Sequence, residues 1–356
     1  MRDTVAALVI GAAGGCLCWL IGIPAPWLAG SMVAGIAAIF SKVRVGMPDW
    51  LKAFAFIFLG IQTGTSVTWD TVDRAAQWPV SIIFLGFTVV AVTWACAWYY
   101  VRFSKWDGPT ALFASLPGAL SLVLLLASTT SADMRRVTIS QCIRLFFLVA
   151  ALPSLISWLS PPDVFYVRPA AIGGVLDVAI LITVSSAAGF ALEWFKVPAG
   201  LMLGPMLASA ALELTGVIEG AAPNSILIPA NIVLGVMIAS RFSGFTFGEF
   251  REALREGFSG FLIALLIAMA GAGITSAVAG LPFALTLLAF SPGGLDAMTI
   301  MAFSLNLDPA YVGAHQMARY IGLALTMPMV TGFVLRRMGG RGQVTAPPIP
   351  SKLEDR

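Results

Sequence analysis

Charged side chains are scarce in this chain of 356 residues: Asp, Glu, Lys and Arg together make up 11%, against 58% hydrophobic residues. A soluble domain carries about 25% charged residues. So little charge excludes a soluble fold, because the apolar surface would be too large to bury. The apolar runs are roughly 20 residues long rather than alternating segments of about 10, which predicts membrane-spanning helices and not a β-barrel.

Histidine and cysteine are scarce as well. The one histidine, His315, argues against a site built from several His ligands for copper, iron or zinc. The four cysteines lie within apolar runs, and we interpret them as small hydrophobic residues rather than disulfide partners or metal ligands. We therefore predict no metal and no cofactor.

Long polar segments and a strong net charge are also lacking. The net charge of +3 is too small to indicate a nucleic-acid partner. A protein that reads DNA directly needs a soluble basic module, and the longest polar piece here, 336–356, is short and rich in Pro and Gly. We interpret it as a disordered cytoplasmic tail.

What the sequence does contain is an internal repeat. The segment 116–153 matches 291–328 without gaps at an offset of 175 residues, and 23–34 matches 197–208 at an offset of 174. The identical pairs of the longer match are Pro117/Pro292, Gly118/Gly293, Leu120/Leu295, Asp133/Asp308, Val137/Val312, Gln141/Gln316, Arg144/Arg319 and Pro153/Pro328.

The repeat divides the chain into two membrane units. We predict a first repeat at 1–160, a linker at 161–169 and a second repeat at 170–335, followed by the tail. Each repeat contains six apolar segments. The fifth ones, 109–130 and 283–304, contain LPGAL and SPGGL, and proline and glycine break helices.

Basic residues predict which segments cross the bilayer, because short cytoplasmic loops are rich in Lys and Arg. If all twelve segments cross, Arg135, Arg136, Arg251 and Arg255 fall on the wrong side. If the fifth segment of each repeat instead enters and leaves by one face, nearly all Lys and Arg become cytoplasmic, as do both termini.

An odd number of crossings per repeat inverts the second repeat relative to the first. The predicted fold is therefore an all-α polytopic membrane protein of two inverted-topology repeats, each with about five crossings plus one broken or re-entrant helix. The alternative, that the fifth segments are kinked full spans, stays open.

Inverted repeats with paired helix breaks are typical of transporter binding sites. We expect the backbone of the two breaks to line a cavity, at Pro117, Gly118, Pro292, Gly293 and Gly294.

Few polar residues lie in the spans, and each is a candidate for solute or ion binding. Asp296 has no acidic counterpart in the first repeat, which suits a coupling ion, H⁺ or Na⁺. Arg144 and Arg319 favour an anionic solute. The alternatives are an ion pair between Arg319 and Asp296, and an Arg144 side chain that reaches to the cytoplasmic surface.

Three further candidates share a helix face with these arginines. Gln141 and Gln316 lie three residues before Arg144 and Arg319, and His315 lies four before Arg319. His315 is a candidate proton carrier, or a buried residue with satisfied hydrogen bonds. We interpret four glycines of the shorter spans as sites of close helix packing: Gly30, Gly60, Gly204 and Gly235.

SPGGLDAM at 291–298 and YVGAHQMARY at 311–320 resemble the AbrB-duplication membrane protein family of bacteria, with support from 23–32 and 197–206. The resemblance covers nearly the whole chain. It implies that the acid at Asp296 is a family feature, often Glu in relatives, whereas LPGALSL of the first repeat has no acid. Two labels come with the family, a regulator of gene expression and an ammonia monooxygenase. We expect no enzyme, because a monooxygenase needs a metal or flavin site.

These observations predict a secondary transporter of a small solute, with an anion favoured, working by alternating access in the bacterial inner membrane. The alternative is a membrane regulator or solute sensor that acts without transport. The partners expected are the lipid bilayer, the solute and a coupling ion, with no direct contact to nucleic acid. A homo-oligomer stays open.

Overall fold

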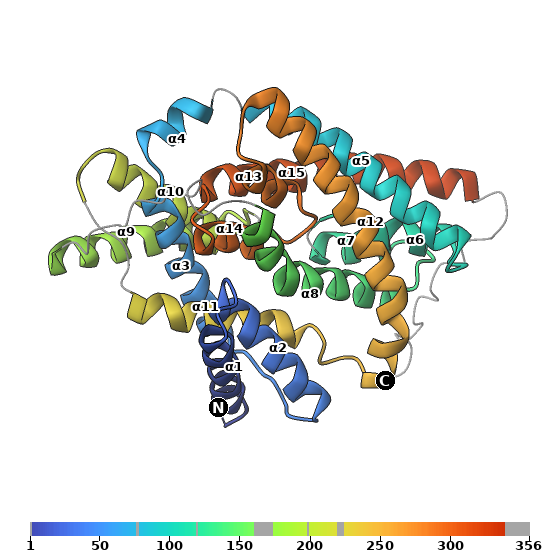
Figure 1. The fold of residues 1–356 in the computed structure, drawn as a ribbon, viewed down its shortest axis with the longest axis horizontal. Helices are drawn as coiled ribbons and strands as arrows, with labels where there is room; N and C mark the ends of the chain where they lie inside the picture. Colours follow the sequence, from blue (N-terminus) through green and yellow to red (C-terminus); the bar gives the residue numbers. More distant parts are fainter. Residues whose placement is uncertain are drawn as a thin grey trace, which may run out of the picture.

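The computed structural model describes residues 2–75, 78–118, 120–159, 174–197, 199–218 and 224–338, which form helices joined by turns, without a β-strand (Figure 1). The predicted linker 161–169 and residues 339–356 of the predicted tail lie outside the described residues. The helices of the first half are α1 (Arg2–Leu20), α2 (Pro26–Phe40), α3 (Asp49–Thr65), α4 (Trp69–Arg74), α5 (Trp78–Arg102), α6 (Gly108–Ser115), α7 (Leu120–Ala127) and α8 (Met134–Leu159). Those of the second half are α9 (Val175–Trp194), α10 (Gly200–Leu214), α11 (Asn224–Ser240), α12 (Phe247–Ala279), α13 (Phe283–Phe290), α14 (Leu295–Ser304) and α15 (Pro309–Met338).

Long apolar helices dominate, as the composition predicts. Within the described residues, five are long and apolar enough to cross a membrane, at Asp3–Leu20, Trp78–Arg102, Met134–Leu159, Leu176–Trp194 and Phe247–Ala279. Large apolar side chains stand on their outer surfaces; Trp94 of α5 is 70% exposed and Trp194 of α9 is 84% exposed. Such exposure is costly in water but natural against lipid, so the described fold is that of a multi-pass membrane protein.

The order of long, short and interrupted helices is the same in the two halves, apart from α4, which the hydropathy pattern did not predict. Helix α12 begins at Phe247 with several charged turns ahead of its apolar part, and a capping box stabilises this start. Thr246 Oγ1 accepts the Glu249 backbone N–H at 3.3 Å, while the Glu249 carboxylate accepts the Thr246 N–H at 2.8 Å.

Glycines allow the short helices to cross at backbone contact. A Cβ on Gly60 of α3 would collide with the carbonyl of Met202 in α10, and one on Gly235 of α11 would lie 2.6 Å from the carbonyl of Leu28 in α2. Added Cβ atoms on Gly30 and Gly204 would likewise collide with the backbone of α1 and α9. The interpretation of these four glycines as close-packing sites is confirmed.

Helix α14 lies at the centre of the molecule and packs against α3, α8 and α15 (Figure 1). It is short, and its residues from Ala297 to Ala302 are buried. Because α8 belongs to the first half, α14 places the second-half break directly beside a first-half helix.

Candidate functional site

Both fifth segments are interrupted where the sequence places proline. Helix α6 ends at Ser115 and α13 at Phe290, and the next helices begin at Leu120 and Leu295. The residues before the prolines are extended, with φ −63° and ψ 123° at Leu116 and φ −60° and ψ 134° at Ser291. A proline clashes with a helical conformation of the preceding residue, so each helix stops there. The predicted breaks are confirmed as interruptions of the helix.

Arg319 of α15 holds the backbone of the second break. Its Nη1 donates to the Ser291 carbonyl at 2.7 Å and its Nη2 to the Gly293 carbonyl at 2.6 Å. Nη2 also donates to Oε1 of Gln316, whose Nε2 donates to the carbonyls of Leu288, Ala289 and Ser291 at 3.3–3.4 Å. These carbonyls form the C-terminal end of α13, where the helix dipole leaves a partial negative charge.

The first break is held in the same way. Arg144 Nη2 donates to the Leu116 carbonyl at 2.9 Å and to Gln141 Oε1 at 3.0 Å. Gln141 Nε2 donates to the carbonyls of Phe113 and Leu116 at 3.0 and 3.4 Å. Each of these bonds has a counterpart 175 residues later in the chain, so the repeat extends to individual hydrogen bonds.

The two alternatives for the arginines are therefore wrong. Arg319 is 5% exposed and Arg144 is 7% exposed, and both bond to backbone carbonyls, so neither reaches to a membrane surface. Within the described part of the chain, no ion pair joins Arg319 to Asp296; the pairs found there involve Lys52, Arg135 and Arg136.

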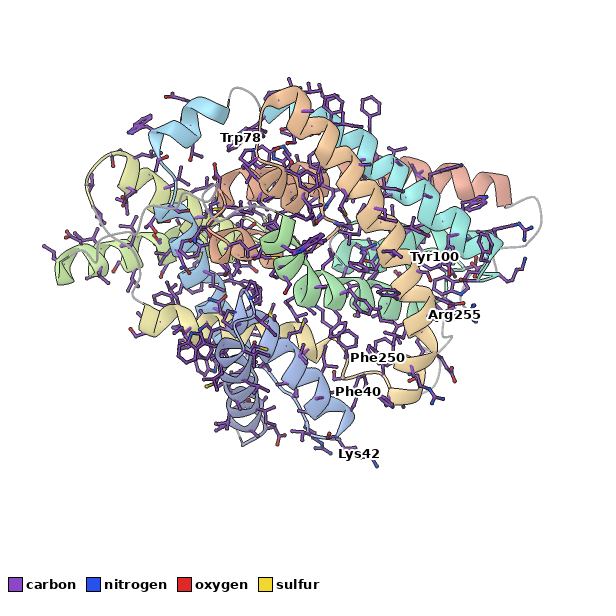
Figure 2. The ribbon with its side chains drawn as sticks, in the orientation of Figure 1. Phe40, Lys42, Trp78, Tyr100, Phe250 and Arg255 are labelled. Atoms are coloured by element: carbon purple, nitrogen blue, oxygen red, sulfur yellow. The ribbon has the colours of Figure 1, made fainter. Side chains whose placement is uncertain are left out.

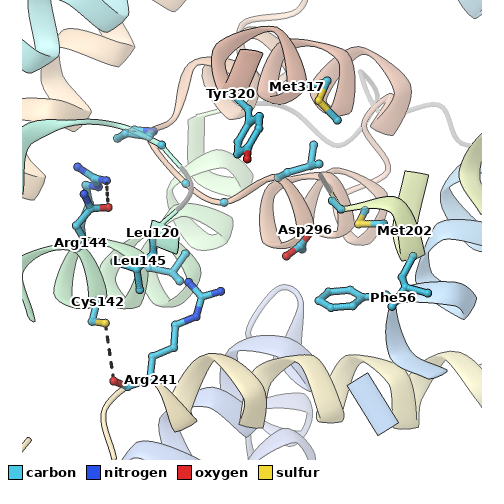
Figure 3. A pocket seen from close by; sticks show the side chains of 18 of the residues that line it. Phe56, Leu120, Cys142, Arg144, Leu145, Met202, Arg241, Asp296, Met317 and Tyr320 are labelled. Atoms are coloured by element: carbon cyan, nitrogen blue, oxygen red, sulfur yellow. Dashed lines mark hydrogen bonds between the residues drawn. The ribbon is translucent and has the colours of Figure 1, made fainter. Parts of the chain in front are cut away.

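A pocket of about 480 Å³ lies between the two breaks (Figure 3). Gly118 and Leu120 line it from the first break, and residues 292–296 line it from the second. Its remaining lining residues are Phe56, Gln141, Cys142, Arg144, Leu145, Glu193, Ala199, Leu201, Met202, Arg241, Met317 and Tyr320. The pocket thus brings together both halves at the positions where helical hydrogen bonding stops.

Asp296 and Arg241 bring opposite charges into this pocket. Figure 3 shows the carboxylate of Asp296, in the first turn of α14, and the guanidinium of Arg241, just after α11, pointing into the same space. Both residues are partly exposed. Among the described residues, neither side chain has an ion pair within 4.0 Å.

His315 lies away from the pocket. Its Nε2 is 2.7 Å from Ser81 Oγ of α5, and its Nδ1 is 2.8 Å from the Tyr311 carbonyl. The ring is fully buried among Trp78, Phe290 and Tyr311. Both nitrogens have partners within the protein, so the geometry favours the structural alternative for this residue, and its role in proton transfer stays a prediction.

The structure adds three polar residues that the sequence did not single out. Arg241 and Tyr320 line the pocket, and Glu193 stands at its exposed rim. The repeat contained a signal for Arg241, which stands where the first half has Ser66. The described residues include no cluster of three His, Cys, Asp or Glu side chains that could hold a metal ion.

Comparisons with known proteins give one matching family and two similar proteins. The family model described as "Transition state regulatory protein AbrB" matches residues 3–69 and 27–335. The protein named "Putative regulator AbrB" of Escherichia coli (strain K12) is 28% identical over 327 residues, covering 88% of this chain and 91% of its own. The protein YhjN of Bacillus subtilis (strain 168) is 25% identical over 354 residues, covering 90% of each chain.

Proposed function

The chain belongs to the AbrB family, and we propose that it is a secondary transporter that moves a small solute across the membrane by alternating access. The observation that carries the proposal is the pocket between two matching helix breaks. Backbone without helical hydrogen bonds is tolerated at membrane depth where it lines a cavity, and paired breaks at a repeat interface are the sign of a transporter binding site.

Two contacts support the inverted arrangement of the repeats. Phe40, at the end of α2, lies beside Phe250 of α12 (Figure 2). Its ring centroid is 5.5 Å from that of Phe247 and 5.1 Å from that of Phe250. Trp69 Nε1 of α4 donates to the Leu214 carbonyl of α10 at 3.1 Å. With twelve crossings each contact would join opposite faces of a bilayer whose apolar core is about 30 Å thick. With five crossings per repeat, each contact joins two segments that lie on the same face of the bilayer.

In this proposal the two halves rock against one another around the pocket. The Arg–Gln pairs keep the broken backbone bonded while the halves move, so the pocket can open to either side without exposing unpaired carbonyls to lipid. Asp296 is the group that binds a coupling ion, H⁺ or Na⁺, or the solute itself. The N-terminus is cytoplasmic, in the bacterial inner membrane.

A second candidate is a membrane regulator that binds the solute and does not move it. The matching family description and the Escherichia coli relative both bear the word regulator. Such a sensor needs the same pocket, but it needs only one side of the pocket to open. No direct contact with DNA is part of either candidate, and neither is an enzyme.

Uptake by proteoliposomes separates the two candidates. The full chain is reconstituted and given a uniformly ¹³C-labelled extract of bacterial small molecules, with and without an imposed H⁺ or Na⁺ gradient, and the lumen is read by mass spectrometry. We expect gradient-dependent accumulation of some labelled compound, lost in Asp296→Asn.

The matched control is Asp133→Asn, which changes a carboxylate outside the pocket. Asp133 caps the first turn of α8, accepting the Arg135 and Arg136 backbone N–H groups at 3.0 and 3.1 Å, and asparagine caps about as well. Its uptake should equal that of the unaltered chain. Accumulation no greater than in protein-free liposomes, under either gradient, would reject transport and favour the sensor.

A further inference from the structure

The arginine that faces Asp296 in the pocket is not one of the two arginines that the sequence suggested. Arg144 and Arg319 were candidates for binding an anion, but both donate to backbone carbonyls at the breaks. Arg319 does not line the pocket. Among the described residues that line the pocket, the arginine without such a partner is Arg241, and it faces the carboxylate of Asp296 (Figure 3). Apart from Glu193 at the exposed rim, the charged side chains of the pocket that do not bond to backbone carbonyls are one of each sign, Asp296 and Arg241, and this does not match a simple anion.

We propose that the solute is a small zwitterion of amino-acid size, whose carboxylate or other anionic group meets Arg241 and whose ammonium group meets Asp296. The inference rests on the proposed function in taking this pocket as the solute site. A molecule carrying both charges neutralises both side chains at once. A carboxylate alone would leave Asp296 without a counter-charge, and an amine alone would leave Arg241 without one; uncompensated charge away from water is costly.

The position of Asp296 favours this assignment. Gly294, Leu295 and Asp296 all line the pocket, so the first turn of α14 opens onto it. Gly294 provides no side-chain cap, and the N–H groups of that turn add a partial positive charge. An anionic group beside Arg241 is therefore attracted by two features of the site, whereas Asp296 supplies the negative charge that an ammonium group needs.

The apolar part of the lining favours a solute with an apolar side chain. Phe56, Leu145, Met202 and Met317 surround the charged pair, and Figure 3 shows the Phe56 ring next to Asp296. A volume of about 480 Å³ leaves room for a molecule the size of leucine or phenylalanine. Apolar side chains thus lie next to each charge. In such surroundings a charge discriminates most strongly between a solute that pairs with it and one that does not.

Matched pools of solutes test the charge requirement by binding rather than by transport. Purified full-length protein in detergent is heated with one of three pools at equal concentration. The first holds alanine, valine, leucine, methionine and phenylalanine; the second holds the same molecules without the amino group; the third holds them without the carboxylate. We expect the first pool alone to raise the unfolding midpoint. Equal protection by the acids or the amines, or protection by none of the pools, would overturn the inference.

Two variants then assign each charge, using the most protective amino acid and its two truncated analogues. Asp296→Asn should weaken binding of the amino acid by about tenfold or more. It should also reduce the ratio between the affinity for the amino acid and the affinity for the acid that lacks the amino group. Arg241→Gln should reduce the ratio between the affinity for the amino acid and the affinity for the amine that lacks the carboxylate. Because both affinities in a ratio are measured on the same variant, a partly misfolded sample does not change the ratio. Unchanged ratios in both variants would overturn the assignment.

The outcomes separate this inference from the proposed function. Binding of the amino-acid pool without uptake into proteoliposomes would reject transport and keep the zwitterion site. Uptake of labelled compounds that carry one charge or none would keep transport and reject the zwitterion.

Discussion

The two helix breaks share a frame and differ in charge. At both, a glutamine and an arginine of the following long helix bond to the last carbonyls of the preceding short helix. Only the second break carries an acid in the pocket, Asp296, and Arg241 faces it. The corresponding positions of the first half are Ser121 and Ser66. The comparison shows which part of the repeat is structural and which is specialised: the backbone clamp is duplicated, and the charged pair is not.

The largest effect is expected in the labelling of introduced cysteines, which should react from one side of the membrane or from the other. In a variant without the native thiols, Gly46→Cys and Arg251→Cys should react with an impermeant maleimide from the cytoplasmic face, and Thr215→Cys only from the opposite face. All three positions are exposed in the structure. Right-side-out and inside-out vesicles provide the measurement. If position 46 shares a side with 215 and not with 251, the halves are not inverted.

The next effect concerns how the two clamps differ. Arg319 uses two nitrogens on two carbonyls, whereas Arg144 uses one nitrogen on one carbonyl. A lysine can replace one such bond but not the fork. Arg319→Lys should therefore lose about 1–3 kcal/mol of stability, the cost of one unsatisfied buried group, and Arg144→Lys clearly less. Thermal unfolding in detergent measures both. Equal losses would mean that the second break depends on its arginine no more than the first does.

A third comparison tests what the halves have in common. Gly60→Ala and Gly235→Ala should each lower stability by about 1–3 kcal/mol, because the added methyl group meets the backbone of the crossing helix. Gly86→Ala in α5 and Gly322→Ala in α15 are matched controls, since nothing lies within 4 Å of a Cβ built there. Replacing a helical glycine at an open site should raise stability slightly. Unequal losses at Gly60 and Gly235 would argue against equivalent crossings.

The breaks themselves were predictable because they are local. A proline excludes the helical conformation of the residue before it, wherever it stands in a fold. LPGAL and SPGGL therefore placed the interruptions at Leu116 and Ser291, where the structure has them. The charged start of α12 has a local signal as well, since Thr246 and Glu249 form a capping box, but the apolar pattern by itself does not include these charged turns.

The roles of the arginines were not predictable in this way. The sequence placed Arg144 and Arg319 in apolar helices but did not indicate whether they faced solute, lipid, an acid or the backbone. That choice depends on which helix lies opposite, and the end of α6 or α13 supplies carbonyls that no sequence pattern marks as partners. The surroundings of His315 depend on the fold in the same way, because it shares a helix with Arg319 but its ring contacts Ser81 of α5.

By itself the sequence determined the membrane class, the duplication and the positions of both interruptions, because composition, internal identity and proline sterics do not depend on distant contacts. Only the tertiary structure decided which charges remain free. Asp296 lies in α14 and Arg241 directly after α11, and both line one pocket because α14 lies at the centre of the bundle, next to the end of α11. Charge in a low-dielectric interior acts over the distance set by packing, and packing is a property of the whole fold.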